Sequence, residues 1–78
     1  MTFTGKTKNL GIIGYPIEHS LSPAIQGAAI ETAGIDYSYI AMPVSPEKLS
    51  LAVTGLASLG FSGFNVTIPH KVAIMDYL

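Results

Sequence analysis

Two serines, Ser20 and Ser22, stand one residue apart immediately before a proline. The residue before a proline is restricted to extended backbone, and in an extended segment residues i and i+2 face the same way. The two hydroxyls would then share one side, with Leu21 turned toward the core. Ser22 and Pro23 also favour a helix start, whose N–H groups attract a carboxylate or a phosphate. The pattern is compatible with an anion site, but spacing alone favours Ser22 as a plain N-cap and Ser20 as a plain loop residue.

A second polar pair, Asn65 and Thr67, alternates with the apolar residues of a short run. In a strand these two side chains share a face. A buried parallel strand is normally apolar on both faces, so both polar groups need partners. They either point toward a polar ligand at the strand end or hydrogen-bond to a neighbouring loop.

Lys71 follows this run directly. A lone lysine is ordinarily solvated. At the mouth of a pocket, however, it could exchange protons with a substrate hydroxyl. His19 and His70 have no identifiable acid partner in the sequence, and we expect them to be exposed or to pack in loops.

Gly11 and Gly14 invite comparison with a dinucleotide-binding loop. That loop needs three glycines and a helix that begins at once, whereas the helix predicted here starts only at Ser22. We therefore expect Gly14 to let the chain turn at a strand end.

The elements that must position these residues alternate along the chain. Strands are predicted at 9–13, 37–42 and 64–68, from apolar and strand-forming residues bounded by glycine or proline. Helices are predicted from Ser22 to Gly34 and from Ser45 to Gly60, and a third begins after Pro69. Helical spacing predicts two core-facing stripes, formed by Ile25, Ala28, Ala29 and Thr32, and by Leu49, Ala52, Val53, Leu56 and Leu59.

This alternation predicts an α/β fold with three αβα layers and a small, mostly parallel sheet. With strand order 2-1-3, the loops after the first and third strands meet where the strand order switches. Ligands of open parallel sheets bind at that place. Because three strands leave two open edges and the chain ends within a helix, we expect residues 1–78 to be the N-terminal part of a larger domain.

The amino-acid composition argues against several kinds of site and partner. There is no cysteine, which excludes disulfides and thiolate metal sites, and two histidines 51 positions apart form no zinc pattern. A net charge of −1 without any arginine argues against nucleic-acid binding. No apolar run could span a membrane and no signal sequence is evident, so a cytoplasmic location is expected. Charged residues are only 12%, so we expect self-association through the exposed sheet edge.

Two segments together resemble a known family. Residues 14–23, GYPIEHSLSP, are similar to the G-x-P-I-x-H-S-x-S-P motif of shikimate dehydrogenases, and residues 63–71, GFNVTIPHK, to that family's G-x-N-V-T-[IV]-P-x-K motif. Both motifs, in this order and about forty residues apart, are highly specific. The resemblance covers the chain from Leu10 onward.

The resemblance implies an oxidoreductase of aromatic amino-acid biosynthesis, which interconverts 3-dehydroshikimate and shikimate with NADP. It implies that Ser20 and Ser22 hold the substrate carboxylate and that Thr67 bonds a ring hydroxyl. Lys71 would be the catalytic acid and base, and Asn65 would support the site.

In this family a downstream Asn and Asp complete the site, and a separate Rossmann domain binds NADP. Neither is present in this sequence, so we expect the chain to supply the substrate-binding part only and to be inactive alone. Relatives that take quinate or prefer NAD share these motifs. The alternative is a non-catalytic ligand-binding or assembly module that keeps the fold.

Overall fold

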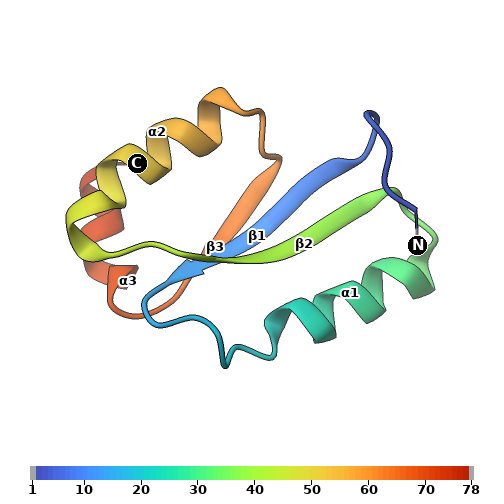
Figure 1. Ribbon diagram of the computed structural model, residues 1–78, viewed down its shortest axis with the longest axis horizontal. Coiled ribbons are helices and arrows are strands. Elements are labelled where there is room, and N and C mark those ends of the chain that lie inside the picture. Colours follow the sequence, from blue (N-terminus) through green and yellow to red (C-terminus); the bar gives the residue numbers. More distant parts are fainter. Residues whose placement is uncertain (1, 78) are drawn as a thin grey trace.

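The computed structural model describes residues 2–77 as a small sheet between helices (Figure 1). Its elements, in chain order, are β1 (Lys8–Gly14), α1 (Ser22–Ala33), β2 (Tyr37–Pro43), the 3-10 turn η1 (Pro46–Lys48), α2 (Leu49–Ser58), β3 (Gly63–Val66), α3 (His70–Ala73) and the 3-10 turn η2 (Ile74–Tyr77). All three predicted strands and all three predicted helices are present.

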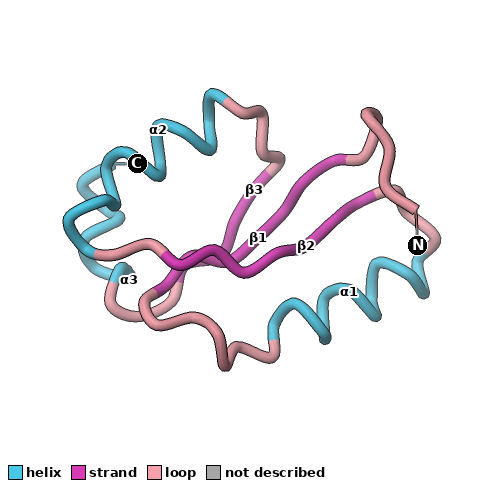
Figure 2. The backbone as a smooth tube through the Cα atoms, viewed as in Figure 1, coloured by secondary structure: helices cyan, strands magenta, loops and turns pink. Residues whose placement is uncertain are grey.

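The three strands are parallel in the order β2-β1-β3, which confirms the predicted sheet. β1 pairs with β2 from Lys8↔Tyr37 to Gly14↔Pro43, and with β3 from Leu10↔Gly63 to Ile13↔Val66. Helix α1 lies against one face of the sheet, and α2 and α3 lie against the other (Figures 1 and 2). The result is the expected three-layer αβα arrangement.

The main core lies between the sheet and α2. Its buried residues are Ile13, Val44, Leu49, Leu56 and Ile74. Strand alternation places Ile13 on this face and Ile12 on the α1 face, where Ile30 is also buried. Each such side chain contributes about 1.5–3 kcal/mol when fully buried. This core fixes α2 and the start of η2 relative to the end of β1.

Glycines end both long helices as predicted. Gly34 has a φ of 69° and Gly60 a φ of 77°, the left-handed conformation that glycine adopts without steric cost. The Gly34 N–H donates to the carbonyls of Ile30 and Glu31, which satisfies the last turn of α1. The chain can therefore reverse at once into β2.

The predicted start of α1 is wrong in detail. Ser22 is already helical, Leu21 is the capping residue, and no side chain caps the helix. Instead, the Ser20 hydroxyl oxygen accepts the Ser22 N–H at 3.2 Å. The Ser22 N–H, which has no partner within the helix, is thus bound by a side chain of the preceding loop.

The predicted core-facing stripe of α1 is also wrong. Ile25 is 62% exposed, and Ala28, Ala29 and Thr32 are exposed too, while Ile30 is the buried residue of this helix. Alanine, glycine or isoleucine residues of α1 lie on nearly every side of this helix, so the spacing of its apolar residues could not identify the buried face. In α2 the stripe is confirmed at Leu49 and Leu56, but Leu59 at its end is exposed.

Strand β3 ends at Val66 and is shorter than predicted. Ile68, which was predicted to belong to it, lies beyond its end and is 69% exposed. After Val66 the chain leaves the strand to turn into α3 at Pro69. The peptide bonds Tyr15–Pro16 and Ile68–Pro69 are both cis. Among residues 2–77, none of the helices has both the length and the apolar character needed to cross a membrane.

Gly14 offers a test of the packing at the end of β1. A Cβ added there would collide with the Thr67 side-chain methyl and lie 3.0 Å from Ile17 Cδ1 and 3.2 Å from the Ile68 carbonyl oxygen. We predict that Gly14→Ala lowers the free energy of unfolding by about 1–3 kcal/mol, as overpacking does.

Gly55→Ala is the matched control, because a Cβ at Gly55 in α2 meets nothing within 4 Å. It should stabilise the protein by about 0.4–1 kcal/mol through the unfolded chain. Urea unfolding of both variants measures the difference. Equal stability of Gly14→Ala and the parent protein would contradict the close packing.

Candidate active site

The ends of the three strands are joined directly at the carboxyl edge of the sheet. The joints are backbone hydrogen bonds of 3.0–3.2 Å, from Thr67 N–H to the Ile13 carbonyl, from Tyr15 N–H to the Ile68 carbonyl, and from Val44 N–H to the Gly14 carbonyl. The loops after β1 and β3 therefore lie side by side, as the strand order predicted. These are the two loops that carry the polar motifs.

Gly14 has a different role from the one expected. Its φ is not positive, so no special turn conformation requires glycine. What requires it is space, because the Thr67 methyl occupies the position that a Cβ would take. Thr67 therefore lies against the end of β1. Gly14 and Ile12 share the α1 face of β1, because they alternate with Ile13, which faces α2. The Thr67 methyl beside Gly14 therefore lies on the α1 face as well.

The serine loop is anchored by Ile17, which is buried. The Ser20 N–H donates to the Ile17 carbonyl at 3.0 Å, and both serines are half-buried. Leu21, expected in the core, is 72% exposed, because Ile17 is the loop residue that packs inward. The Ser20 oxygen accepts the Ser22 N–H, which leaves the Ser20 hydroxyl proton to donate to another acceptor. A carboxylate or a phosphate is such an acceptor.

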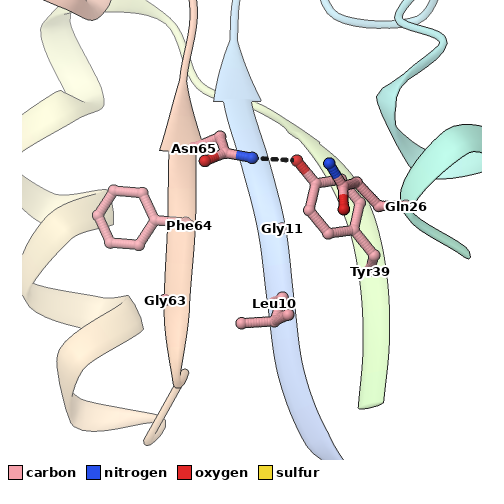
Figure 3. A pocket seen from close by; sticks show the side chains of 7 residues that line it. All are labelled: Leu10, Gly11, Gln26, Tyr39, Gly63, Phe64 and Asn65. Carbon is pink, nitrogen blue, oxygen red and sulfur yellow. Dashed lines mark hydrogen bonds between the residues drawn. The ribbon is translucent and has the colours of Figure 1, made fainter. Parts of the chain in front are cut away.

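Asn65 is tied to β2 across the central strand. Its Nδ2 donates to the Tyr39 hydroxyl oxygen at 2.8 Å (Figure 3). Figure 3 shows Gln26 of α1 beside the Tyr39 ring, while Phe64 points to the opposite face of the sheet. The bond fixes the Asn65 amide, so ordinary hydrogen bonding accounts for one of its polar groups.

A pocket of about 230 Å³ surrounds this pair on the α1 side of the sheet. It is lined by Leu10, Gly11, Gln26, Tyr39, Gly63, Phe64 and Asn65. Of the predicted site residues it includes only Asn65, so it lies beside the serine and lysine positions and not between them. Sequence reasoning treated Tyr39 only as part of a strand, yet its period-two relation to Tyr37 and Ala41 assigns it to the α1 face.

Lys71 is the second residue of α3 and is exposed. The preceding residue, His70, is 1% exposed, and its Nε2 lies within hydrogen-bonding distance of the Val44 carbonyl. Of the two alternatives expected for His70, exposure is wrong, and packing against a loop is what the structure has, because the carbonyl that follows β2 offers a buried partner. His19 is exposed. Among the described residues no hydrogen bond joins Lys71 to Ser20 or Ser22, so their relation rests on the adjoining loops.

The glycines of β1 do not form a cofactor cradle. A Cβ at Gly11 would lie 2.5 Å from Met42 Cε and 2.7 Å from the Ile40 carbonyl, so the protein itself fills that space. Gly14 is closed by Thr67 in the same way. Helix α1 begins only at Ser22, with the Tyr15–Leu21 loop in between. These residues do not fit a dinucleotide pyrophosphate. Within residues 2–77, moreover, no three His, Asp or Glu side chains gather as a metal site would require.

Comparisons with known proteins agree on one family. Residues 12–78 match the family described as the shikimate dehydrogenase substrate binding domain. The NADP(+) shikimate dehydrogenase of Citrifermentans bemidjiense is 58% identical over 78 residues, which are all of this chain and 27% of that protein. The chain thus spans about a quarter of the length of such relatives.

Solved structures give the same result at the level of the backbone. A shikimate dehydrogenase crystallised in complex with NADP+ matches 99% of this chain and 27% of its own, with a TM-score of 0.96 and 49% identity. Shikimate 5-dehydrogenase from Listeria monocytogenes, in complex with shikimate and NAD, matches all of this chain and 27% of its own, with a TM-score of 0.95 and 38% identity. The family match over most of the chain, the αβα fold and the two motif-bearing loops lead to one conclusion: the chain belongs to the shikimate dehydrogenase family, in the substrate-binding domain of that family.

Proposed function

We propose that residues 1–78 form the N-terminal part of the substrate-binding domain of an NADP-dependent shikimate dehydrogenase. The reaction is the interconversion of 3-dehydroshikimate and shikimate, a step of aromatic amino-acid biosynthesis. The observation that carries the proposal is the hydrogen-bonded junction of the loops after β1 and β3. These loops hold Ser20 and Thr67 and lead directly into the helix starts that carry Ser22 and Lys71.

In this proposal Ser20 and Ser22 bind the substrate carboxylate. Two half-buried hydroxyls beside the first turn of a helix suit a carboxylate, because hydroxyl donors and the helix N-terminus both favour negative charge. Thr67, which lies against the end of β1, bonds a ring hydroxyl. Asn65, fixed by Tyr39, supports the same face.

Lys71 acts as the acid and base. Reduction of the ketone leaves an oxygen that must gain a proton, and oxidation of shikimate must remove the proton from the hydroxyl. An ammonium group at the edge of the site can donate the proton, and the neutral amine can accept it. The positive charge also stabilises an oxygen that becomes negative during the reaction.

The cofactor, NADP, is held outside this chain in the proposal, because the glycines of β1 are closed by Met42 and Thr67. The 78-residue chain alone is therefore inactive. It also associates through its sheet edge, since the order β2-β1-β3 leaves the outer sides of β2 and β3 without a partner strand among residues 2–77.

Turnover by the full-length protein tests the function. We expect shikimate-dependent reduction of NADP, followed by absorbance, and none from residues 1–78 alone. Shikimate binding without turnover by the full-length protein would favour the non-catalytic ligand-binding or assembly module.

The serine pair gives a prediction about substrate affinity. In the full-length enzyme Ser20→Ala or Ser22→Ala removes a hydrogen bond to a charged group, worth about 1.5–3 kcal/mol. We expect KM for shikimate to rise by roughly 10- to 100-fold with a smaller change in kcat. Ser50→Ala, an exposed serine in α2, is the control and should leave KM unchanged. Parental KM in both site variants would refute the carboxylate assignment.

The lysine gives a prediction about the rate. Lys71→Met keeps most of the length of the side chain and removes its charge, so we expect kcat to fall by about 10²–10⁴-fold with little change in KM. Lys48→Met, at an exposed lysine in η1, is the matched control and should keep the parental kcat. A Lys71→Met enzyme that lost only affinity would make Lys71 a binding residue.

A further inference from the structure

His70 is a buried polar residue that the proposed chemistry does not use. With Ile13, it is one of the two large side chains that are less than 2% exposed among the described residues. Burying an imidazole costs free energy unless its polar atoms find partners, so a residue needed only to fill space would more readily be apolar. The histidine must therefore supply something besides volume.

What His70 supplies is a directed hydrogen bond to the residue that follows β2. Its Nε2 lies on the carbonyl oxygen of Val44, the residue directly after β2. A carbonyl oxygen can only accept, so Nε2 must carry the proton and donate it. The histidine thus acts here as a fixed donor.

This bond joins the start of α3 to all three strand ends. The His70 N–H donates to the Thr67 carbonyl at 3.0 Å, and the Val44 N–H donates to the Gly14 carbonyl at 3.0 Å. His70 therefore connects the loop after β3 with the residue after β2 through its side chain. Val44 continues the connection to the end of β1.

The position of Lys71 follows from this anchor. Successive residues of a helix are rotated by about 100°, and residues four apart share a face. His70 and Ile74 are both buried, so they define the inward face of this turn, and Lys71 is exposed at its side. Helix α3 has only four residues, and Ile74, directly after it, is held in the core. The His70 bond holds the other end of this turn.

We propose that His70 is a positioning residue for Lys71. The Nε2–H···O=C bond to Val44 sets the rotation and depth of the first turn of α3, and so sets where the Lys71 ammonium group lies relative to Thr67 and the end of β1. The inference rests on the proposed role of Lys71 and extends it to a residue that contacts neither substrate nor cofactor.

The test compares variants of the full-length enzyme that keep or lose the donor. His70→Phe fills the space without a donor, and we expect kcat to fall roughly 10- to 100-fold, as a misplacement of about 1 Å can cause. KM for shikimate should change little, because Ser20 and Ser22 are untouched. His70→Gln carries an amide N–H near the position of Nε2 and should recover most of the lost rate.

The decisive measurement is the double variant with Lys71→Met. If His70 acts through Lys71, His70→Phe should lower kcat no further in the Lys71→Met background. An equal fall in both backgrounds would mean a general structural role and would overturn the inference, as would a parental kcat in His70→Phe. A parental kcat in Lys71→Met would overturn both the proposed role of Lys71 and the inference about His70. If Lys71→Met lowers kcat as expected and the effects of the two substitutions are additive, only the inference about His70 is overturned.

If His70→Phe does not fold, the comparison of His70→Gln with His70→Asn replaces it. Both side chains carry amides, but the Asn amide is one bond shorter and cannot reach the Val44 carbonyl from the same backbone position. Gln should keep the rate and Asn should lose it. Equal kcat values in the two variants would overturn the proposal.

Discussion

The site depends on the hydrogen bonds that join the three strand ends. Parallel strands end at the same edge, but the loops beyond them are free to diverge unless something holds them. Here the Ile13 and Gly14 carbonyls of β1 accept N–H groups from the chain after β3 and after β2, respectively. The two sequence motifs, about forty residues apart, are joined directly by the bond from the Tyr15 N–H to the Ile68 carbonyl. These hydrogen bonds satisfy buried backbone groups at the same time, so the junction stabilises the fold as well as the site.

Much of this arrangement could be predicted from the sequence. The strands have runs of apolar or β-forming residues, and the two long helices end at glycines that adopt positive φ. Alternation of strand and helix then predicted a parallel sheet, in which the order 2-1-3 places the two motif-bearing loops side by side. These features depend on local chemistry that one segment expresses by itself.

The wrong or missed predictions concern residues whose surroundings are set by another residue of the fold. Ser22 was predicted to cap α1, but it is already the first residue of the helix, and the Ser20 hydroxyl oxygen accepts its N–H. Leu21 could have packed inward, but Ile17 occupies that role in the same loop. His70 is polar and adjoins a lysine, yet the Val44 carbonyl, directly after β2, gives it a buried partner. Nothing in the residues around Tyr39 indicated that the Asn65 amide, 26 residues away, would donate a hydrogen bond to its hydroxyl oxygen. The partners of His70 and Tyr39 are each 26 residues away and cannot be read from the neighbouring residues.

The contact between Gly14 and Thr67 has a consequence for how this sequence can vary. The two positions share one fixed volume, since the threonine methyl occupies the place of a missing Cβ. A larger residue at position 14 therefore requires a smaller one at position 67, and the effects of single changes will not add. Serine at position 67 would free the space and keep a hydroxyl, whereas valine would keep the methyl and remove the hydroxyl. Variation at the end of β1 is thus coupled to the group available for the substrate, and mutational libraries must sample the two positions as a pair.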